Sequence, residues 1–312
     1  MKIGLDIFGG DYAPDAILGG AIQAYHEMES GVKIVLIGNE TDVFAYCKKN
    51  GFDAGNFEIV HTESAIGMGE HPAKSFAQKR DSSIVKGFYL LQQEMIDVFA
   101  SAGNTGAMLV GAMQVVKSIP GVIRPSIAAA IPRLSDSPTI LVDVGINVDC
   151  KPDVLYQYAI LGSLYAEHVY NIHNPRVGLL NIGSEEEKGN LLSKTTFQAM
   201  KGTNEFNFIG NVEGNDFFSE KVDVIVCDGF VGNVLLKQAE AVYRLIRQRN
   251  IVDDFFEKFN FENIGGTPVL GINAPVIIGH GISNEKAIKN MILHAREMVI
   301  ANLPDKIKQA FK

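Results

Sequence analysis

The chain contains no tryptophan and only three cysteines in 312 residues. These cysteines, Cys47, Cys150 and Cys227, lack the close spacing of a metal-binding motif, and an odd number does not suggest a disulfide framework. We expect each to be a small buried hydrophobic residue rather than a reactive thiol. The sequence also has no full Walker motif and no G-x-G-x-x-G after its first strand. We therefore expect no metal and no bound cofactor.

Positive charge is also scarce, since 28 lysines and arginines face 36 aspartates and glutamates, for a net charge of −8. That balance argues against a nucleic-acid binder, which usually carries a basic excess. No apolar run approaches the ~20 residues that a membrane span needs. Because the chain starts directly with a strand pattern, we expect no signal peptide and a cytoplasmic location.

The bulk composition, 46% hydrophobic and 21% charged, is ordinary for a soluble globular protein. Strand-like runs alternate with helical patterns almost throughout. This predicts an α/β fold, layered α/β/α around a mostly parallel sheet. We expect a single domain over residues 1–312, as one body or two closely packed lobes, with a small protruding segment near 244–264.

Individual elements can be placed by their periodicity. The expected strands are Ile3–Ile7, Val32–Ile37, Glu58–His61, Val98–Ala102, Ser126–Ile131, Thr139–Val144, Val177–Asn181, Phe208–Glu213, Val222–Cys227 and Pro268–Ile278. The expected helices are Ala16–Met28, Thr41–Lys49, Ser82–Glu94, Ala107–Val116, Val154–Tyr170 and Asn190–Met200, with Asp11 as N-cap of the first. Residues Ile251–Asn263 are the weakest candidate for a fixed element.

One unit recurs: an apolar strand ends in Gly, Asn or Asp and turns straight into a helix. Its copies are Lys2–Asp11, Val98–Ala107 and Val222–Lys237. Glycine lets the backbone approach a ligand, and the free N–H groups that open a helix attract anions. In a parallel sheet such turns gather at the carboxyl edge, where ligands bind. The pattern predicts a phosphorylated ligand in a crevice shared by these turns.

Each candidate residue has a structural alternative. Asp6, Asp143 and Asp228 follow strands, where an aspartate either caps the next helix or contributes to a site. Asn104 and Thr105 either cap the apolar helix after them or form a phosphate cradle with the glycines that frame them.

Single charged and ionisable residues are weighed in the same way. Lys188 either belongs to a solvated helix start or meets an anion from a strand-end pocket. Arg124 is held extended by the proline after it, and is suited to either a phosphate contact or a surface ion pair. His71 and His280 are structural hydrogen-bonding residues or direct participants.

At this point the sequence resembles the bacterial phosphate acyltransferases of phospholipid synthesis (PlsX). The matching segments run in order from residue 1 to about 295. They are Asp6–Pro14, Lys79–Ser83, Ser101–Ala107, Arg124-Pro125, Asp143–Pro152, Pro175–Gly183, Glu185–Gly189, Gly210–Gly214, Val226–Asn233 and His280-Gly281.

The resemblance implies a fold related to isocitrate dehydrogenase and phosphotransacetylase, and a homodimer. It implies transfer of a fatty acyl group from acyl carrier protein to inorganic phosphate, giving acyl phosphate for the acylation of glycerol 3-phosphate. The chain departs from the family pattern at Ala77, where an arginine is usual. It also has a shortened segment between Leu236 and Gly265, which leaves Ile251, Phe255, Phe256 and Phe259 as a reduced candidate for weak peripheral membrane contact.

Acyl transfer to phosphate needs positioning and oxyanion stabilisation more than a strong base. As oxyanion donors we expect Asn147, Asn181 and Lys188, with His280 protonating the departing thiolate. The expected phosphate- and substrate-binding residues are Asp6, Gly9, Gly10, Asp11, Gly103, Asn104, Thr105, Gly106, Arg124, Asp228, Gly229 and Asn233.

An acidic carrier protein would need a basic patch to dock. Candidates are Lys237, Arg244, Arg247 and Arg249 on one helical stretch, or Lys79 and Arg80; the alternative is an ordinary solvated face. Three rival functions stay open: a phosphotransacetylase-like enzyme that uses acyl-CoA, an isocitrate-type dehydrogenase, and a non-enzymatic phospholigand-binding protein.

Overall fold

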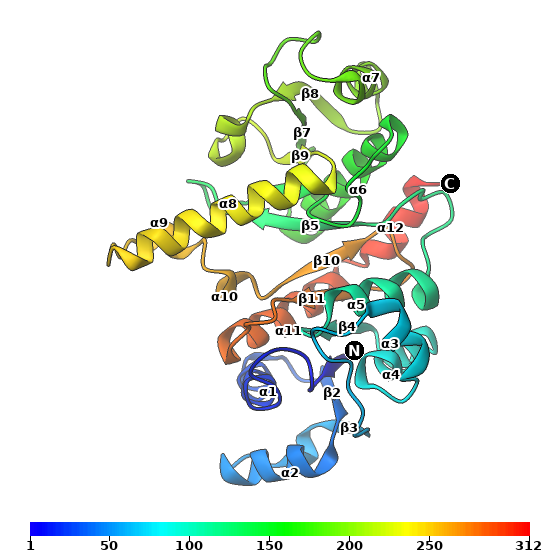
Figure 1. Cartoon of the computed structure of the whole chain (residues 1–312), viewed down its shortest axis with the longest axis vertical. Coiled ribbons are helices and arrows are strands. Elements are labelled where there is room, and N and C mark those ends of the chain that lie inside the picture. Colours follow the sequence, from blue (N-terminus) through cyan, green and yellow to red (C-terminus); the bar gives the residue numbers. More distant parts are fainter. The chain divides into compact units, whose positions relative to one another are not determined.

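A computed structural model describes all residues, 1–312, and the chain forms two compact units. The first unit comprises residues 1–117 and 261–300, and the second comprises residues 118–260 and 301–312. Figure 1 gives the labels of the helices and strands. No helix is both long enough and apolar enough to cross a membrane.

The first unit is built on strands in the order β3-β2-β1-β4-β11-β10. All neighbouring pairs are parallel except the last, β10 with β11. The strands are β1 (Lys2–Asp6), β2 (Lys33–Gly38), β3 (Glu58–His61), β4 (Val98–Ser101), β10 (Gly266–Leu270) and β11 (Val276–Gly279). The prediction of one strand over Pro268–Ile278 is therefore wrong, because residues 271–275 turn the chain back into an antiparallel hairpin.

The helices of this unit follow its strands. They are α1 (Asp15–Glu27), α2 (Glu40–Lys49), η1 (Ala54–Asn56), α3 (Pro72–Gln78), α4 (Ser83–Gln92), α5 (Thr105–Gly111), η2 (Ala112–Val116), α10 (Phe261–Ile264) and α11 (Glu285–Ile300). Helix α1 packs closely on α11, since a Cβ at Gly20 would lie 2.6 Å from Ile288 Cβ. Pro14, not the predicted Asp11, occupies the N-cap of α1.

The second unit has strands in the order β5-β6-β9-β7-β8. They are β5 (Ser126–Ile131), β6 (Thr139–Val142), β7 (Arg176–Leu180), β8 (Asn207–Val212) and β9 (Val224–Val226). Strands β5 and β6 form an antiparallel pair, and the other neighbours are parallel. The turns after β6, β7 and β9 therefore leave the same edge of the sheet.

Helices α6 (Pro152–Tyr170), α7 (Leu191–Met200), η3 (Gly214–Phe218), α8 (Gly229–Gln248), α9 (Asp254–Glu257) and α12 (Leu303–Ala310) complete this unit. Residues 251–263, predicted to be the least ordered element, contain α9 and the start of α10. Near the amino ends of β7 and β9, buried Asp223 pairs with Arg133 at 3.0 Å and with Arg176 at 2.8 Å. This cluster of charges ties the loop at Arg133 to the sheet.

Candidate active site

In the first unit, a buried carboxylate organises the turn after β1. Asp6 ends that strand and is 1% exposed. Its carboxylate accepts hydrogen bonds from the Ser101 hydroxyl at 2.7 Å and from the Phe8 N–H at 3.0 Å. Ser101 Oγ in turn accepts from the Gly103 N–H at 2.9 Å. Burial raises the pKa of Asp6, and these hydrogen bonds oppose the shift.

Glycine is required where the two turns of this unit meet. A Cβ on Gly9 would lie 2.6 Å from the Gly103 nitrogen and 2.9 Å from an Asp6 carboxylate oxygen. Gly10 has a φ of +102°, which favours glycine. The following N–H, of Asp11, donates to the Gly281 carbonyl at 2.7 Å. The structure thus brings the predicted Gly9-Gly10 and Gly103 turns into direct contact.

The side chain of Asn104 is fully engaged within the chain. Its oxygen caps α5 by accepting from the Ala107 N–H at 3.0 Å. Its amide donates to the carbonyls of Gly67, Met68 and Glu70 at 3.0–3.2 Å. Asn104 therefore holds the loop before α3 in place. Any contact that this turn makes with an anion must come from other groups.

Thr105 and Gly106 complete this turn, and His280 is the residue predicted to protonate the leaving thiolate. Gly106 packs against Pro72 too closely for a Cβ, while Thr105 is exposed. His280 is also exposed; its ring lies 5.2 Å from that of Phe261, and its Nδ1 accepts from the Ile282 N–H at 3.5 Å. His71 caps α3 through its Nδ1, which confirms a structural part for that residue.

In the second unit, Asp143 has the corresponding position after β6. It is fully buried and accepts from the Ile127 N–H at 3.0 Å and the Asn147 N–H at 2.7 Å. The Asn147 amide lies 3.3 Å from the same carboxylate and donates to the Pro125 carbonyl at 2.8 Å. Burial raises the pKa of Asp143, and the backbone hydrogen bonds oppose the shift. Asn147 is thus fixed at the edge of the sheet.

The start of α8 packs onto this turn. Asp228 caps the helix by accepting from the Val231 N–H at 2.9 Å, and the Gly229 N–H donates to the Asn147 carbonyl at 2.8 Å. A Cβ on Gly229 would lie 2.8 Å from Asp143 Oδ2, and one on Gly232 would overlap the Asp143 carbonyl. The space that these glycines leave is therefore filled by the Asp143 turn. The side chain of Asn233 lies beside Gly145 of that turn.

The third turn of this edge follows β7. The Asn181 side chain accepts from the Ile182 N–H at 2.9 Å and donates to the Lys188 carbonyl at 3.1 Å. Lys188 itself is exposed. Asn211, buried on β8, donates to the Glu185 carbonyl at 2.8 Å and so supports the loop that carries Lys188. We did not single out Asn211 from the sequence, although it lies in the matching segment Gly210–Gly214.

Arg124 and Cys150 lie near the Asp143 turn. Arg124 is exposed, and its guanidinium donates to the Asp149 carbonyl at 2.9 Å. Burial raises the pKa of Cys150 to about 11, and the negative charges of Asp143 and Asp228 add to the shift. Burial also raises the pKa values of the Cys47 and Cys227 thiols. Cys47 and Cys227 are buried, as predicted, whereas Cys150 is only half-buried.

The strand-end turns hold polar side chains in fixed places, which suits a reaction that depends on the alignment of its reactants. Three turns after parallel strands place Asn147, Asp228 and Asn181 at one edge of the second unit, as predicted from their strand ends. The first unit holds its own pair of glycine turns around Asp6. No group of three or more His, Cys, Asp or Glu side chains is placed to hold a metal ion.

The fold has relatives among solved structures. A phosphotransacetylase from Streptococcus pyogenes matches with a TM-score of 0.66 and 15% identity, covering 96% of this chain and 94% of that one. A branched-chain phosphotransacylase from Enterococcus faecalis matches with a TM-score of 0.64 and 14% identity, covering 96% and 99%. The chain therefore has a phosphotransacetylase-like α/β fold, as predicted.

Sequence similarity identifies the family within this fold. Residues 1–306 match the family model described as "Fatty acid synthesis protein". A phosphate acyltransferase of Dictyoglomus turgidum is 43% identical, over 98% of this chain and 96% of the relative. Others, from Halothermothrix orenii and Salinibacter ruber, are 40% and 38% identical over 98% or more of both chains. The chain belongs to this family (PlsX) and is an acyltransferase.

Proposed function

We propose that the chain transfers a fatty acyl group from acyl carrier protein to inorganic phosphate and releases acyl phosphate for phospholipid synthesis. The observation that carries the proposal is similarity along the whole chain to relatives named phosphate acyltransferases, at 38–43% identity. The glycine turns after Asp6 and Asp143 support it, because they suit small anionic groups better than a bulky polar substrate.

The reaction needs no strong base. An oxygen of phosphate attacks the thioester carbonyl carbon, a C–O bond forms, the C–S bond breaks, and the thiolate leaves on the carrier. Inorganic phosphate is already an anion, and partly a dianion, at neutral pH, because its second pKa lies only somewhat above the ~6 of a phosphate ester. Catalysis then depends on alignment of the reactants and on donors to the developing oxyanion.

The chain offers groups for each task. In the first unit, we assign phosphate to the N–H groups of the Gly9-Gly10 and Gly103–Gly106 turns, and protonation of the thiolate to His280. Buried Asp6 holds these turns together, and Asp11 follows the first of them. In the second unit, Asn181 and Lys188 are the proposed oxyanion donors. Asn147, whose two amide hydrogens already point to Pro125 and Asp143, is assigned to holding the turn in place. Arg124 is assigned to phosphate, and Asp228, Gly229 and Asn233 to substrate.

Carrier-protein docking is assigned to basic side chains that remain unpaired on α8 and at its C-cap, Arg249. Lys237 is paired with Glu240 at 2.9 Å and Arg247 with Glu257 at 2.7 Å, which reduces the predicted patch. Arg244 and Arg249 are exposed. Lys79 is likewise paired, with Glu70 at 2.5 Å. We therefore place the acidic carrier protein against Arg244 and Arg249, with long-range attraction as the driving term.

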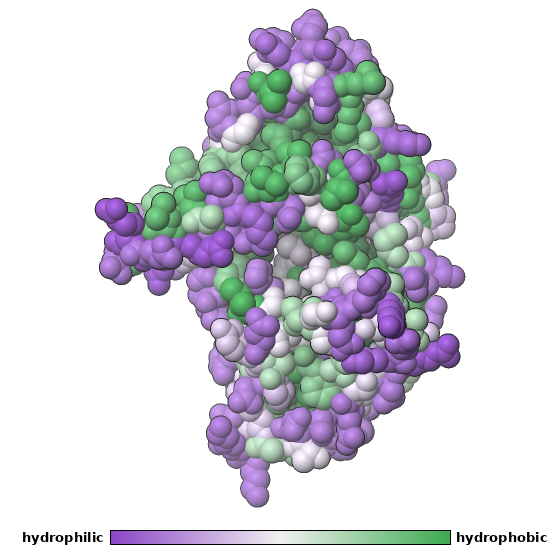
Figure 2. All heavy atoms as spheres, viewed as in Figure 1, coloured by the Kyte–Doolittle hydropathy of each residue, from purple (hydrophilic) through white to green (hydrophobic).

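We further propose that the enzyme works in the cytoplasm as a homodimer. Exposed apolar residues at the start of α8, namely Phe230, Val231 and Val234, support a partner surface on this part of the helix. Figure 2 shows hydrophobic residues at the surface along α8 in this view. Of the residues considered for weak membrane contact, Ile251 is 48% exposed, while Phe255, Phe256 and Phe259 are only partly exposed and line a pocket.

The decisive experiment measures thiol release from palmitoyl carrier protein, with and without inorganic phosphate and without added metal. Release that requires phosphate, with acyl phosphate trapped by hydroxylamine, is the expected result. Release from palmitoyl-CoA alone would favour the second candidate, a phosphotransacetylase-like enzyme, to which the fold similarity points. Phosphate binding without turnover of either donor would leave a phospholigand-binding protein.

A further inference from the structure

The second unit contains an apolar cavity that the proposed reaction has not yet used. Its volume is about 420 Å³, within the ~300–1,000 Å³ of ligand pockets. Gln238 and the Tyr243 hydroxyl are the only polar side-chain groups among its lining residues. A water molecule occupies ~30 Å³ in the liquid, and a methylene group is of similar size. The cavity therefore has room for more than ten methylene groups.

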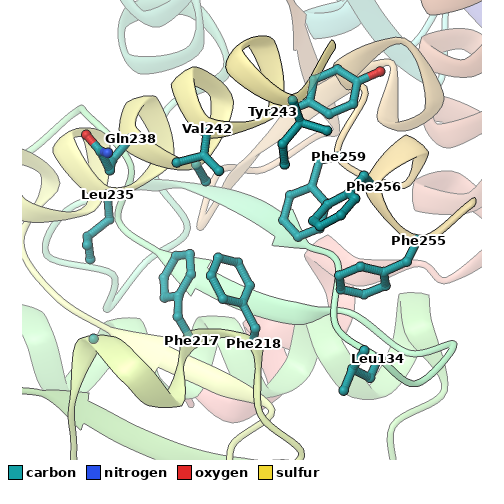
Figure 3. Close-up of a pocket in the computed structure, with 13 residues that line it drawn as sticks. Leu134, Phe217, Phe218, Leu235, Gln238, Val242, Tyr243, Phe255, Phe256 and Phe259 are labelled. Carbon is teal, nitrogen blue, oxygen red and sulfur yellow. The ribbon is translucent and has the colours of Figure 1, made fainter. Parts of the chain in front are cut away.

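One wall of the cavity is a band of aromatic rings from two separate segments. Phe217 and Phe218 come from η3, and Phe255, Phe256 and Phe259 come from α9 and the residues after it. Their rings meet edge to face, with Phe218 and Phe255 each 5.5 Å from Phe259. Figure 3 shows these side chains gathered opposite α8.

The segment that carries α9 is tied down on both sides. Glu257 accepts from the Tyr243 hydroxyl at 3.2 Å and pairs with Arg247, both on α8. Lys258 lies 3.6 Å from Asp136, next to the lining residue Leu134. The cavity is thus a built feature, held open between α8 and the aromatic band. Val242 and Leu134 still leave 46% and 76% of their surface exposed.

The other wall of the cavity continues from the candidate site. Gly232, which packs on the Asp143 turn, is followed on the same face of α8 by Leu235, Ala239, Val242 and Ile246, at steps of three and four residues. With a rise of ~1.5 Å per residue, the lined stretch begins ~9 Å from Gly229 and runs for ~16 Å. Figure 1 shows α8 as one uninterrupted helix.

We infer that this cavity binds the hydrocarbon chain of the fatty acyl donor, with the thioester end toward the Asp143–Asn147 turn and the methyl end along α8. The inference rests on the proposed function for the identity of the ligand. A saturated chain offers no hydrogen-bonding group and fits a wall of leucine, valine and phenylalanine. Each methylene that enters the cavity adds affinity, so the cavity determines chain-length preference.

The first test measures binding without turnover. Cis-parinaric acid, a fluorescent long-chain fatty acid, is titrated into the full chain, into Ala239→Trp, which fills the cavity, and into Ala241→Trp. Ala241 is exposed on the same helix and does not line the cavity. We expect at least tenfold weaker binding for A239W and unchanged binding for A241W. Val242→Asn, a substitution at a part-exposed position, gives a second variant and is expected to weaken binding as well.

The second test compares palmitoyl with butyryl carrier protein as donors. For A239W we expect kcat/KM to fall more than tenfold with the palmitoyl donor, because displacing only two methylene groups from the cavity is worth about tenfold. With the butyryl donor, whose chain is too short to reach Ala239, kcat/KM should stay within about twofold. A241W should keep the wild-type ratio between the donors. Equal losses on both donors in A239W would overturn the inference.

The two tests separate this inference from the proposed function. Tight parinarate binding that A239W and V242N weaken would support the cavity assignment even if the wild type shows no phosphate-dependent thiol release. Failure of the wild type to bind parinarate would overturn it, whatever its activity. If A239W instead changes the sedimentation coefficient and binds parinarate as the wild type does, the cavity belongs to an interface with a second copy and the assignment is wrong.

Discussion

Each of the two units holds a buried aspartate at the end of a strand, but the donors around the two carboxylates differ. Asp6 accepts one backbone N–H and one serine hydroxyl, whereas Asp143 accepts backbone N–H groups on both of its oxygens. A hydroxyl can turn and become an acceptor, and a backbone N–H cannot. The turn in the second unit is therefore specified more strictly than the turn in the first.

The same contrast extends to the groups assigned to chemistry. In the second unit Asn147 and Asn181 are fixed by their own hydrogen bonds. Lys188 is exposed on the loop between Asn181 and α7. In the first unit His280 is the only proposed chemical group, and its role is one that a thiolate leaving group does not strictly need. We expect the larger catalytic effects in the second unit.

The largest effect is expected for Lys188→Ala. Loss of one oxyanion donor lowers turnover by about 10²–10³-fold. Because Lys188 is exposed, thermal stability should not change. Lys194→Ala, which removes an exposed lysine from α7, is the matched control and should keep full turnover. Full turnover by K188A in the phosphate-dependent thiol-release assay would remove the assigned role.

The comparison of the two aspartates can be tested directly by Asp143→Asn and Asp6→Asn. An asparagine at 143 must direct an NH₂ group at a backbone N–H, which leaves a buried donor unpaired at a cost of about 2 kcal/mol. An asparagine at 6 can donate to Ser101 Oγ, and should cost about 1 kcal/mol or less. Urea unfolding followed by circular dichroism measures both. A D6N variant as unstable as D143N would contradict the distinction.

Acid stability provides a third comparison, between Asp223 and Asp6. Burial disfavours ionised Asp223, but hydrogen bonds from Arg176 and Arg133 outweigh it and hold its pKa below the ordinary value. The stability that it contributes is therefore present above the unfolded-state pKa and is lost as the pH falls through the lower folded-state pKa. Asp6, whose pKa is raised by burial, acts in the opposite direction, because the folded chain binds its proton first as the pH falls.

We therefore expect Asp223→Asn to lower stability at neutral pH and to flatten its loss in acid. Melting temperatures between about pH 3 and pH 7, around the ordinary carboxyl range, measure the effect. D6N should instead make the loss in acid steeper, because it removes a group that takes up a proton in the folded state. Parallel pH profiles for D223N and the wild type would show that the Asp223 pairs contribute no pH dependence.

Much of the fold could be predicted because strand and helix patterns are local. The strands Glu58–His61 and Ser126–Ile131 were predicted with the bounds that the structure has, since each has apolar residues at its centre and polar or turn residues around it. The hairpin of β10 and β11 was missed although its turn contains Gly271, Asn273 and Pro275, which favour a turn, because the apolar residues on both sides of them resemble one long strand.

The site was predicted less completely because its partners are remote in sequence. The identities of Asn104 and Asp143 could be picked out, but not the loop at Gly67–Glu70 that Asn104 holds, 34 or more residues away. The apolar cavity was not predicted either, because its walls come from η3, α8 and α9 and no single segment carries its pattern.

The smallest effect is expected for His280→Ala in the first unit. Thiolates leave without protonation, so removal of this acid should lower phosphate-dependent turnover by less than about tenfold, below the ~10²–10⁴ range of general acid–base catalysis. The rate with a carrier-protein donor measures this loss, and His71→Ala, which removes only a cap, is the control for stability. A loss for H280A as large as that for K188A would mean that departure of the thiolate limits the rate. The contrast between the two units would then disappear, because each unit would hold a group on which turnover depends to the same extent.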